Sequence, residues 1–254
     1  MVPVTPTDRR GALRAGTAAA LAGALATACG TDRPAPRTQR PAPAPAAPAP
    51  RHYPGRPVEI TSGPRHRPRV ALTFHGQGDP ATAHAILDRA ERAGARVTVL
   101  AVGDWLDHHP GLARRVLDGG HDLGNHTQHH LDITAMTEDR AHTEIEACAQ
   151  RLRRLTGSIG TWFRPSRTRH AGETVRRAAR RAGYPHVLSY DVDSLDFTSP
   201  GPAAVVANIT REIRNGSVVS LHFGYADTVA ALPVLLADLD RRGLSAVTTT
   251  ELLT

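Results

Sequence analysis

From residue 69 to the end of the chain, short apolar segments typical of strands alternate with longer segments typical of helices. Alternation of this kind predicts an α/β domain built on a parallel sheet. The expected strands are 69–74, 96–102, 121–124, 161–164, 186–191, 217–222 and 245–248, and the expected helices are 81–93, 109–119, 138–155, 171–182, 203–214 and 228–242. Repeated strand–helix units in this order indicate a (β/α)7 barrel, either closed or incomplete.

Residues 1–29 have the pattern of an export signal. Arg9 and Arg10 precede an apolar run over 18–28, which is too short to span a membrane. The paired arginines resemble a twin-arginine signal. The run ends at Cys29 in a sequence similar to a lipobox, although Leu25 lies one place further from the cysteine than is usual. We therefore expect export to the cell envelope and a lipid anchor on Cys29 that holds the protein on the outer side of the cytoplasmic membrane. A cleaved signal with an incidental cysteine is the alternative.

Residues 30–66 are rich in proline and alanine, with scattered arginines. A segment of this composition cannot bury a core and is expected to be an extended, disordered tether. The remaining residues, 67–254, are expected to form one domain, which is long enough to bury a substantial core.

The charge and the cysteines exclude some functions. The formal net charge is +7, and every basic residue is an arginine. No aromatic-rich basic patch accompanies this charge, so nucleic acid is not an expected partner. Cys148 is the second of two cysteines, so lipidation of Cys29 would exclude a disulfide within the chain. Cys148 lies in the helical pattern 138–155, where we expect it to be a small packed residue.

Polar side chains recur at the points where the expected strands end. They are His75, His126, His130, Arg164, the segment 191–196 and His222. In a parallel barrel the carboxyl ends of the strands meet at one face, which holds the active site. His126 and His130 are four residues apart, a spacing that lets two imidazoles bind one metal ion. The sequence therefore predicts a metal site at this face.

The histidine segment resembles a known family. His126-Thr127-Gln128-His129-His130 matches the motif H-S/T-x-x-H of the polysaccharide deacetylases (NodB homology domain, carbohydrate esterase family 4), and residues 120–125 match the sequence that usually precedes it. The resemblance implies a distorted (β/α)7 barrel over the whole domain. It also implies a metal-dependent hydrolase that removes N-acetyl, and sometimes O-acetyl, groups from polysaccharides.

In that family two histidines and an aspartate hold zinc or a similar divalent ion, which binds the attacking water and polarises the acetyl carbonyl. The resemblance implies that His126 and His130 are metal ligands. His222, in a late Leu-His motif, would be the general acid for the leaving amine. Asp196 would orient His222. The expected cofactor is therefore a divalent metal, with zinc as the first choice.

The first motif departs from the family pattern T-F-D-D-G, in which the first aspartate is the general base and the second is a metal ligand. Here His75 stands at the position of the base and Gly76 at the position of the ligand. His75 could become the third ligand of a three-histidine site, which leaves a position open for water. Alternatively, Asp79 could enter the site as ligand or as base. The sequence leaves both open.

The third motif also differs, because Arg164-Pro165 is followed by Ser166-Arg167 without the usual aromatic residue. The resemblance implies that Arg164 braces the catalytic base and that Phe197 and Leu221 line the substrate pocket. Arg167 and Arg169 add positive charge near the mouth of the site, either as a solvated loop or as a substrate clamp.

These observations predict an exported deacetylase whose partner is an N-acetylated polysaccharide or peptidoglycan. Because both family aspartates of the first motif are missing, a catalytically inactive relative that binds glycan at the same cleft is a serious alternative. An O-acetyl esterase is a third hypothesis, since the altered first motif changes the residue at the position of the general base. The retention of His126, His130, Asp196 and His222 together favours the enzyme.

Overall fold

The computed structural model describes residues 47–254. The expected export signal, Cys29 and the first part of the expected tether lie outside the described residues. Within 47–254, none of the helices combines the length and the hydrophobicity needed to span a membrane.

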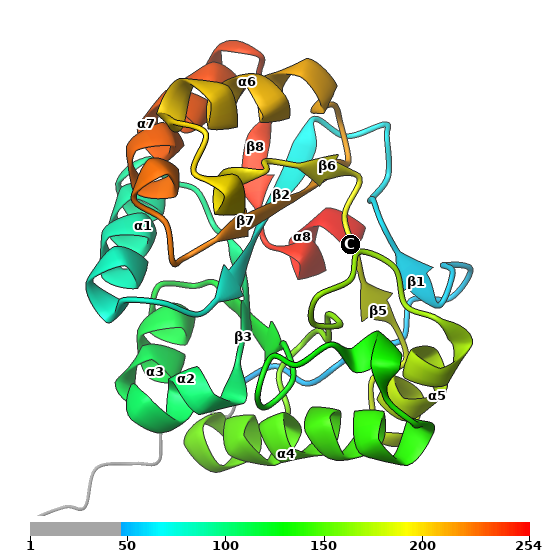
Figure 1. Cartoon of the computed structure of the whole chain (residues 1–254). Helices are drawn as coiled ribbons and strands as arrows, with labels where there is room; N and C mark the ends of the chain where they lie inside the picture. The colour runs from blue at the N-terminus through cyan, green and yellow to red at the C-terminus, as the bar shows by residue number, and fades with distance from the viewer. Residues whose placement is uncertain (1–46) are drawn as a thin grey trace, which may run out of the picture. The chain divides into compact units, whose positions relative to one another are not determined.

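Parallel strands form the centre of the domain (Figure 1). They are β1 (Glu59–Ile60), β2 (Arg69–Gly76), β3 (Thr98–Ala101), β4 (Asp122–Asn125), β5 (Val187–Leu188), β6 (Val192–Asp193), β7 (Val218–His222) and β8 (Ser245–Val247). The larger sheet has the order β4-β3-β2-β7-β6, and β8 pairs with the first residues of β2. β1 and β5 form a separate pair. Every pairing between these strands is parallel, as the sequence predicted.

The two sheets are joined through Phe163. This residue makes a parallel bridge to Asn125 at the end of β4. The backbone N–H of Leu188 in β5 donates to the carbonyl of Phe163 at 2.8 Å, and β6 follows β5 and pairs with β7. The path from β4 through Phe163, β5 and β6 to β7 has the order of a distorted (β/α)7 barrel. The predicted α/β class is confirmed, although the expected strand 161–164 contributes only a bridge.

Helices surround the strands (Figure 1). They are α1 (Pro80–Arg92), α2 (Gly103–His108), α3 (Gly111–Asp118), α4 (Glu138–Thr156), α5 (Glu173–Arg181), α6 (Pro202–Glu212), α7 (Ala226–Arg241) and α8 (Thr249–Leu253), with short 3-10 helices η1 (Ile133–Ala135) and η2 (Asp196–Thr198). α7 packs against α1 and α6, and α4 packs against α5. The largest core cluster includes Phe74, Val99, Cys148 and Leu221, all buried. Cys148 is thus a packed residue as predicted, and burial raises the pKa of its thiol to about 12.

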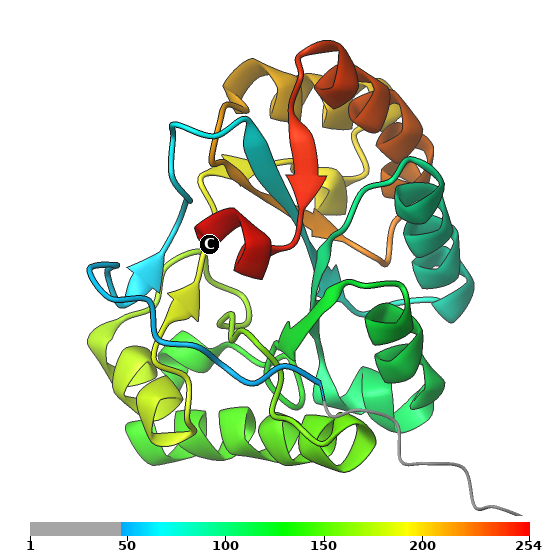
Figure 2. The same ribbon diagram turned by 180° about the vertical axis from the view of Figure 1, so that it is seen from behind.

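The amino-terminal ends of the strands are covered by α8, which Figure 2 shows from behind. The backbone N–H of Thr250 at this helix donates to the carboxylate of Asp122 at 2.9 Å. The indole N–H of Trp162 donates to the same carboxylate at 3.2 Å. This end of the domain is therefore closed by hydrogen bonds to the buried Asp122.

The expected tether is wrong for its last part, because residues 47–66 pack on the domain. Tyr53 stacks on Trp162 with ring centroids 5.5 Å apart, and its backbone N–H donates to the imidazole of His186 at 3.0 Å. β1 extends β5 by backbone pairing. The aromatic ring and the strand pairing supply contacts that a proline-rich composition does not reveal, so the domain begins before residue 67.

Candidate metal centre and acid site

Strand register brings the predicted site residues to one end of the sheet. His75 on β2 and His222 on β7 occupy paired positions of neighbouring parallel strands. Because side chains at paired positions point to the same face, their rings stack with centroids 4.2 Å apart. His126 follows β4 directly, and its ring lies 4.5 Å from that of His75. The ends of three separate strands thus meet at one cluster of imidazoles.

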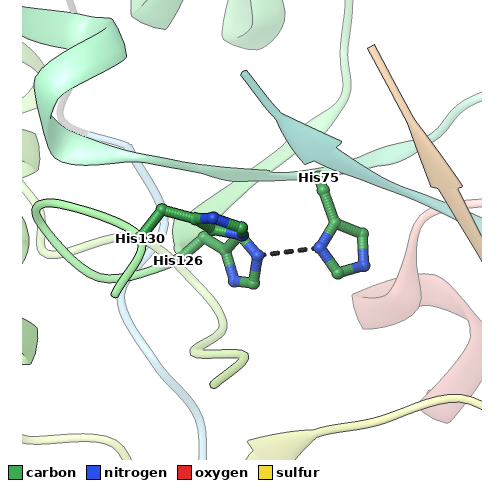
Figure 3. A group of neighbouring side chains, drawn as sticks. All are labelled: His75, His126 and His130. Carbon is green, nitrogen blue, oxygen red and sulfur yellow. Dashed lines mark hydrogen bonds between the residues drawn. The ribbon is translucent and has the colours of Figure 1, made fainter. Parts of the chain in front are cut away.

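His75, His126 and His130 form a group of possible metal ligands. Each residue offers one ring nitrogen as a ligand, and these three nitrogens all lie within 4.8 Å of one another. Figure 3 shows the three rings gathered at the end of β2. Of the two alternatives for the third ligand, the structure therefore brings His75, and not Asp79, to His126 and His130.

The hydrogen bonds of His126 determine which nitrogen faces the group. Its Nδ1 donates to the backbone carbonyl of Arg164 at 2.9 Å, since a carbonyl can only accept. The neutral ring therefore presents the lone pair of Nε2, which accepts from Nδ1 of His75 at 2.7 Å (Figure 3). Nε2 of His75 then accepts from the hydroxyl of Ser220 at 3.1 Å. Binding a cation at this group requires the proton between His75 and His126 to leave.

The loop that carries His130 is held in a conformation unusual for its residues. Thr127 and His130 have φ of 69° and 54°, in the left-handed region that favours glycine. Asn125 stabilises the loop, because its Oδ1 accepts from the N–H of Thr127 at 2.8 Å and its Nδ2 donates to the carbonyl of Ile145 at 2.8 Å. Strain of this kind persists where the surroundings fix the backbone and is typical of functional sites.

Burial keeps these imidazoles neutral. The pKa values of His75 and His126 are held well below their usual range, first by removal from water and then by the positive groups around them. The pKa of His130 is lowered by burial and by the charge of Arg167. Neutral imidazole is the form that binds zinc and similar ions. Three neutral imidazoles close to one another therefore fit a divalent cation of the zinc class, with no carboxylate among the described ligand candidates.

Arg164 lies fully buried beside His75. Its guanidinium donates to the carbonyls of Leu188 and Ser189 and to the hydroxyl of Thr73, at 3.2, 3.1 and 2.8 Å. Its Nη1 is 3.4 Å from Nε2 of His75. Burial lowers its pKa to about 10. Arg164 thus lies beside the residue at the base position, and within 47–254 none of its hydrogen bonds is to a carboxylate.

The structure brings His222 and Asp196, the pair predicted to act in proton transfer, into direct contact. Nδ1 of His222 donates to Oδ1 of Asp196 at 2.7 Å, and the backbone N–H of His222 donates to Oδ2 at 2.8 Å. The hydroxyl of Thr228 at the start of α7 donates to Oδ2 at 2.6 Å. Asp196 is fully buried, and three donors fix its carboxylate. The Nε2 atom of His222 is therefore left free to exchange a proton in the cavity.

Asp79 does not enter the site. It is the N-cap of α1, and its Oδ1 accepts from the N–H of Ala81 at 2.8 Å. An aspartate directly before a helix that begins with proline is a strong capping signal, and the cap occupies the carboxylate outside the site. The reading of Asp79 as ligand or base is therefore corrected.

The prediction for Leu221 is also wrong, whereas that for Phe197 agrees with the structure. Successive side chains of a strand point to opposite faces, so Ser220 and His222 of β7 line the cavity while Leu221 packs in the core beneath the helices. Phe197 is 46% exposed and lines the cavity with its ring edge-on to His222. The same alternation in 218–222 places Ser220 on the cavity side, a residue that was not among the predicted site residues.

Two cavities open on the histidines. The first, of about 360 Å³, continues past Arg167, Arg169, Tyr190 and Asp193. The second, of about 440 Å³, continues past four uncharged residues, Gln77, Gly78, Gly224 and Tyr225. His75, His130, Phe197 and His222 line both. The site is therefore a groove with two arms that meet at the imidazoles.

The chain is similar to known proteins in sequence and in fold. Residues 62–187 match the family model described as polysaccharide deacetylase. A peptidoglycan-N-acetylglucosamine deacetylase of Bacillus cereus is 31% identical over 202 residues, covering 75% of this chain and 90% of the relative. A family 4 carbohydrate esterase from Streptomyces lividans, solved in complex with acetate, has a TM-score of 0.65 at 26% identity, covering 70% of this chain and 91% of that chain. A family 4 pseudoenzyme from Bacillus anthracis shares the fold, with a TM-score of 0.73 at 22% identity, covering 78% of this chain and 70% of that chain.

Proposed function

Because this chain belongs to the polysaccharide deacetylase family, carbohydrate esterase family 4, we propose that it hydrolyses N-acetyl amide bonds of a glycan such as peptidoglycan. It would be a hydrolase of non-peptide carbon–nitrogen bonds. A divalent cation, zinc in the first place, would be held by His75, His126 and His130. The observation that carries the proposal is that the three-histidine group lies beside the hydrogen-bonded pair of Asp196 and His222, with His75, His130 and His222 lining one cavity.

When bound, the cation would supply Lewis-acid activation of water and of the acetyl carbonyl. The residues of the chain orient the ligands, transfer the proton and shield the cavity. The carbonyl of Arg164 accepts from His126 and so directs the lone pair of Nε2 into the group. Asp196 holds Nδ1 of His222, so that Nε2 can donate a proton to the departing nitrogen. Phe197 stands beside His222 and shields one side of the cavity.

With His75 among the ligands, the position of the family's base is no longer free to accept a proton. We propose that His222 takes both roles, first accepting the proton of the attacking water and then donating it to the leaving amine. The two steps use the same Nε2 atom, because Nδ1 is bonded to Asp196 throughout. The stacking of His222 on His75 at 4.2 Å places it beside the ligand group, where it can serve both steps.

A second candidate is an inactive member of the family that binds glycan in the same groove. It is favoured by Gly76, which offers no side chain at the family's ligand position, and by the buried Arg164, which has no carboxylate partner in 47–254. The Bacillus anthracis protein that shares the fold is described as a pseudoenzyme of the same family.

Metal content distinguishes the ligand sets. We expect about one equivalent of zinc in the wild type, loss of zinc in His126→Ala and in His75→Ala, and retention in Asp79→Ala, where only a helix cap worth about 1 kcal/mol is removed. Asp79→Ala is the matched control, since it removes the one other residue considered as third ligand. Retention of zinc in His75→Ala with loss in Asp79→Ala would contradict the three-histidine site.

Acetate release distinguishes the functions. The wild type and His222→Ala are assayed on chitooligosaccharide, on peptidoglycan and on O-acetylated xylan. Acetate from the first two, lost in His222→Ala, supports the deacetylase. Acetate from xylan alone would make the protein an esterase. No acetate from any substrate, together with glycan binding that survives in His222→Ala, would support the inactive binding protein.

We also propose that the protein is exported and anchored by lipid on Cys29, on the strength of the sequence pattern of residues 1–29. The anchor is tested by labelling cells with radioactive palmitate and separating the membrane fraction. Label and membrane association should be lost in Cys29→Ala and kept in Cys148→Ala, because Cys148 is buried in the core. Label retained in Cys29→Ala would contradict the anchor.

A further inference from the structure

The two arms of the groove differ in charge. The arm past Gln77, Gly78, Gly224 and Tyr225 has no ionic side chain beyond the shared histidines. The other arm carries two guanidinium groups and one carboxylate. A ligand that extends through the site therefore meets a neutral surface on one side and a net positive one on the other.

Arg169 is held in a fixed orientation in the charged arm. Its guanidinium lies over the ring of Tyr190, 4.9 Å from the centroid, and Nε and Nη2 donate to the carbonyl of Tyr190 at 3.3 and 3.2 Å. Nη2 also donates to the carbonyl of Asp191 at 3.2 Å. The backbone carbonyl of Arg169 accepts from the hydroxyl of Ser189 at 2.6 Å. No hydrogen bond of Nη1 to another described residue is present, so this edge can bind a ligand.

Arg167 stands in the same arm without a hydrogen-bond partner for its guanidinium in the described part of the chain, and its charge contributes to the lowered pKa values of Asp132 and His130. Among residues 47–254 its guanidinium makes no hydrogen bond or ion pair. Its backbone has φ of 56°, where glycine or asparagine would be less strained. The preceding Ser166 anchors the loop by donating to the carbonyl of Leu131 at 2.5 Å. Backbone strain of this kind persists where the surroundings fix the loop, and it is typical of ligand-binding sites.

The carboxylate in this arm limits the charge that the arm can bind. Asp193 lines the cavity, and its Oδ1 accepts from the N–H of Leu195 at 3.0 Å. Two guanidiniums and one carboxylate leave one net positive charge, which suits a monoanion better than a phosphate dianion. Arginine also matches the planar geometry of a carboxylate through two parallel hydrogen bonds.

We propose that Arg167 and Arg169 bind a carboxylate carried by the substrate, so that the protein acts on acidic N-acetylated glycans. The carboxylate belongs either to an ether substituent on the acetylated sugar, as in muramic acid, or to a uronic acid beside it. The uncharged arm binds a neutral sugar on the other side. This inference rests on the proposed function only in that the acetylated sugar lies at the histidines.

The test compares neutral and acidic ligands on the zinc-supplemented full chain. Affinity by calorimetry and kcat and KM from acetate release are measured for chitotetraose, for an oligosaccharide of N-acetylglucosamine and N-acetylmuramic acid, and for one of N-acetylglucosamine and glucuronic acid. The variants are Arg167→Gln, Arg169→Gln and the double variant. Arg154→Gln, an exposed arginine on α4 that does not line the groove, is the matched control.

We expect the wild type to prefer at least one acidic oligosaccharide over chitotetraose by about tenfold or more in affinity and in KM. Each arginine substitution should reduce that preference by about tenfold through KM rather than kcat, since one charge-assisted contact is lost. Arg154→Gln should keep the preference. Added salt should weaken it, because it is electrostatic.

The inference is overturned if the wild type binds neutral and acidic oligosaccharides equally, or if the double variant keeps the preference. These outcomes are separate from failure of the proposed function. A protein that releases no acetate but prefers acidic ligands in calorimetry retains the carboxylate site, whereas one that deacetylates chitotetraose without preference loses it. The acidic oligosaccharide that is preferred identifies where the carboxylate lies.

Discussion

Each of the two sides of the site holds one buried charged side chain, and the two side chains differ in their hydrogen-bond partners. On the side of β7 and η2, the buried carboxylate of Asp196 receives three hydrogen bonds, two of them from His222. On the side of β2, the buried guanidinium of Arg164 has only neutral acceptors, and an imidazole stands where the family has a carboxylate. One side pairs a buried charge with a hydrogen-bonded residue that can carry the opposite charge, and the other holds a buried charge whose hydrogen bonds are all to neutral groups.

This difference has a chemical consequence. Removing a charge from water is costly unless a partner compensates it, and the cost on the side of β2 appears in the lowered pKa values of Arg164 and His75. A neutral His75 is a good ligand for a cation but a poor replacement for a carboxylate base. The side of β2 is therefore suited to metal binding and the side of β7 to proton transfer.

The largest effect is expected from Asp196→Ala, which breaks the acid side. Acetate release should fall by about 10²–10⁴-fold, because His222 loses the group that orients it. The free energy of unfolding should fall by about 1–3 kcal/mol or more, because buried donors lose their acceptor. Bound zinc, measured by mass spectrometry, should stay unchanged, since the ligands lie on the other side. Loss of zinc together with activity would show that the two sides are not separable.

A smaller effect is expected from restoring both aspartates with the double substitution His75→Asp and Gly76→Asp. The carboxylate at 75 would lie beside Arg164, and the one at 76 would restore the family's residue at the ligand position, so acetate release should rise by about tenfold or more. A Cβ at 76 would approach Ala101 Cα and Val99 Cγ1 to 3.0 Å, so Gly76→Asp alone should be destabilised by about 1–3 kcal/mol.

The control for this restoration is the pair His75→Asn and Gly76→Asn, which has nearly the same shape without the charge. We expect it to release less acetate than the wild type. If the double aspartate variant binds zinc but works no faster than the wild type, three imidazoles serve this chain as well as the family's carboxylates do. The contrast between the two sides would then have no catalytic consequence.

The smallest effect is expected from pH on the metal-free chain. In the unfolded chain the imidazoles titrate near 6.5, and burial holds the pKa values of His75 and His126 well below this in the folded chain. Below about pH 6.5 the unfolded state binds more protons, so the free energy of unfolding falls as the pH falls, by about 1.4 kcal/mol per pH unit for each imidazole kept neutral.

Urea unfolding in the presence of chelator, at about pH 7.5 and about pH 5.5, measures this loss. His75→Asn should lose less stability between the two pH values than the wild type, because one neutral imidazole has been removed. Equal losses in the two proteins would show that His75 is not kept neutral by the fold.

Much of the site could be predicted because its residues lie in recognisable local sequence patterns. His126 and His130 lie within one short motif, and His75, Arg164 and His222 stand at the ends of apolar strand patterns. The carboxyl ends of parallel strands gather at one face whatever the details of packing. The fold class and the meeting of these residues therefore followed from the pattern.

Other features depended on conformation that no local pattern specifies. The choice between His75 and Asp79 was decided by the cap of α1, and the outward position of Leu221 by the register of β7. The packing of residues 47–66 depends on Tyr53 reaching Trp162, more than a hundred residues away in sequence.

The sequence by itself thus determined the order of strands and helices, the family and the residues able to bind a metal. The tertiary structure decided which of those residues meet, which side of a strand faces the groove, and that Arg167 and Arg169 form one charged arm. The physical reason is that composition and periodicity act between near neighbours, whereas a site is made by contacts between the ends of distant segments. Such contacts depend on strand register and on the φ angles of a few loop residues, among them His130 and Arg167.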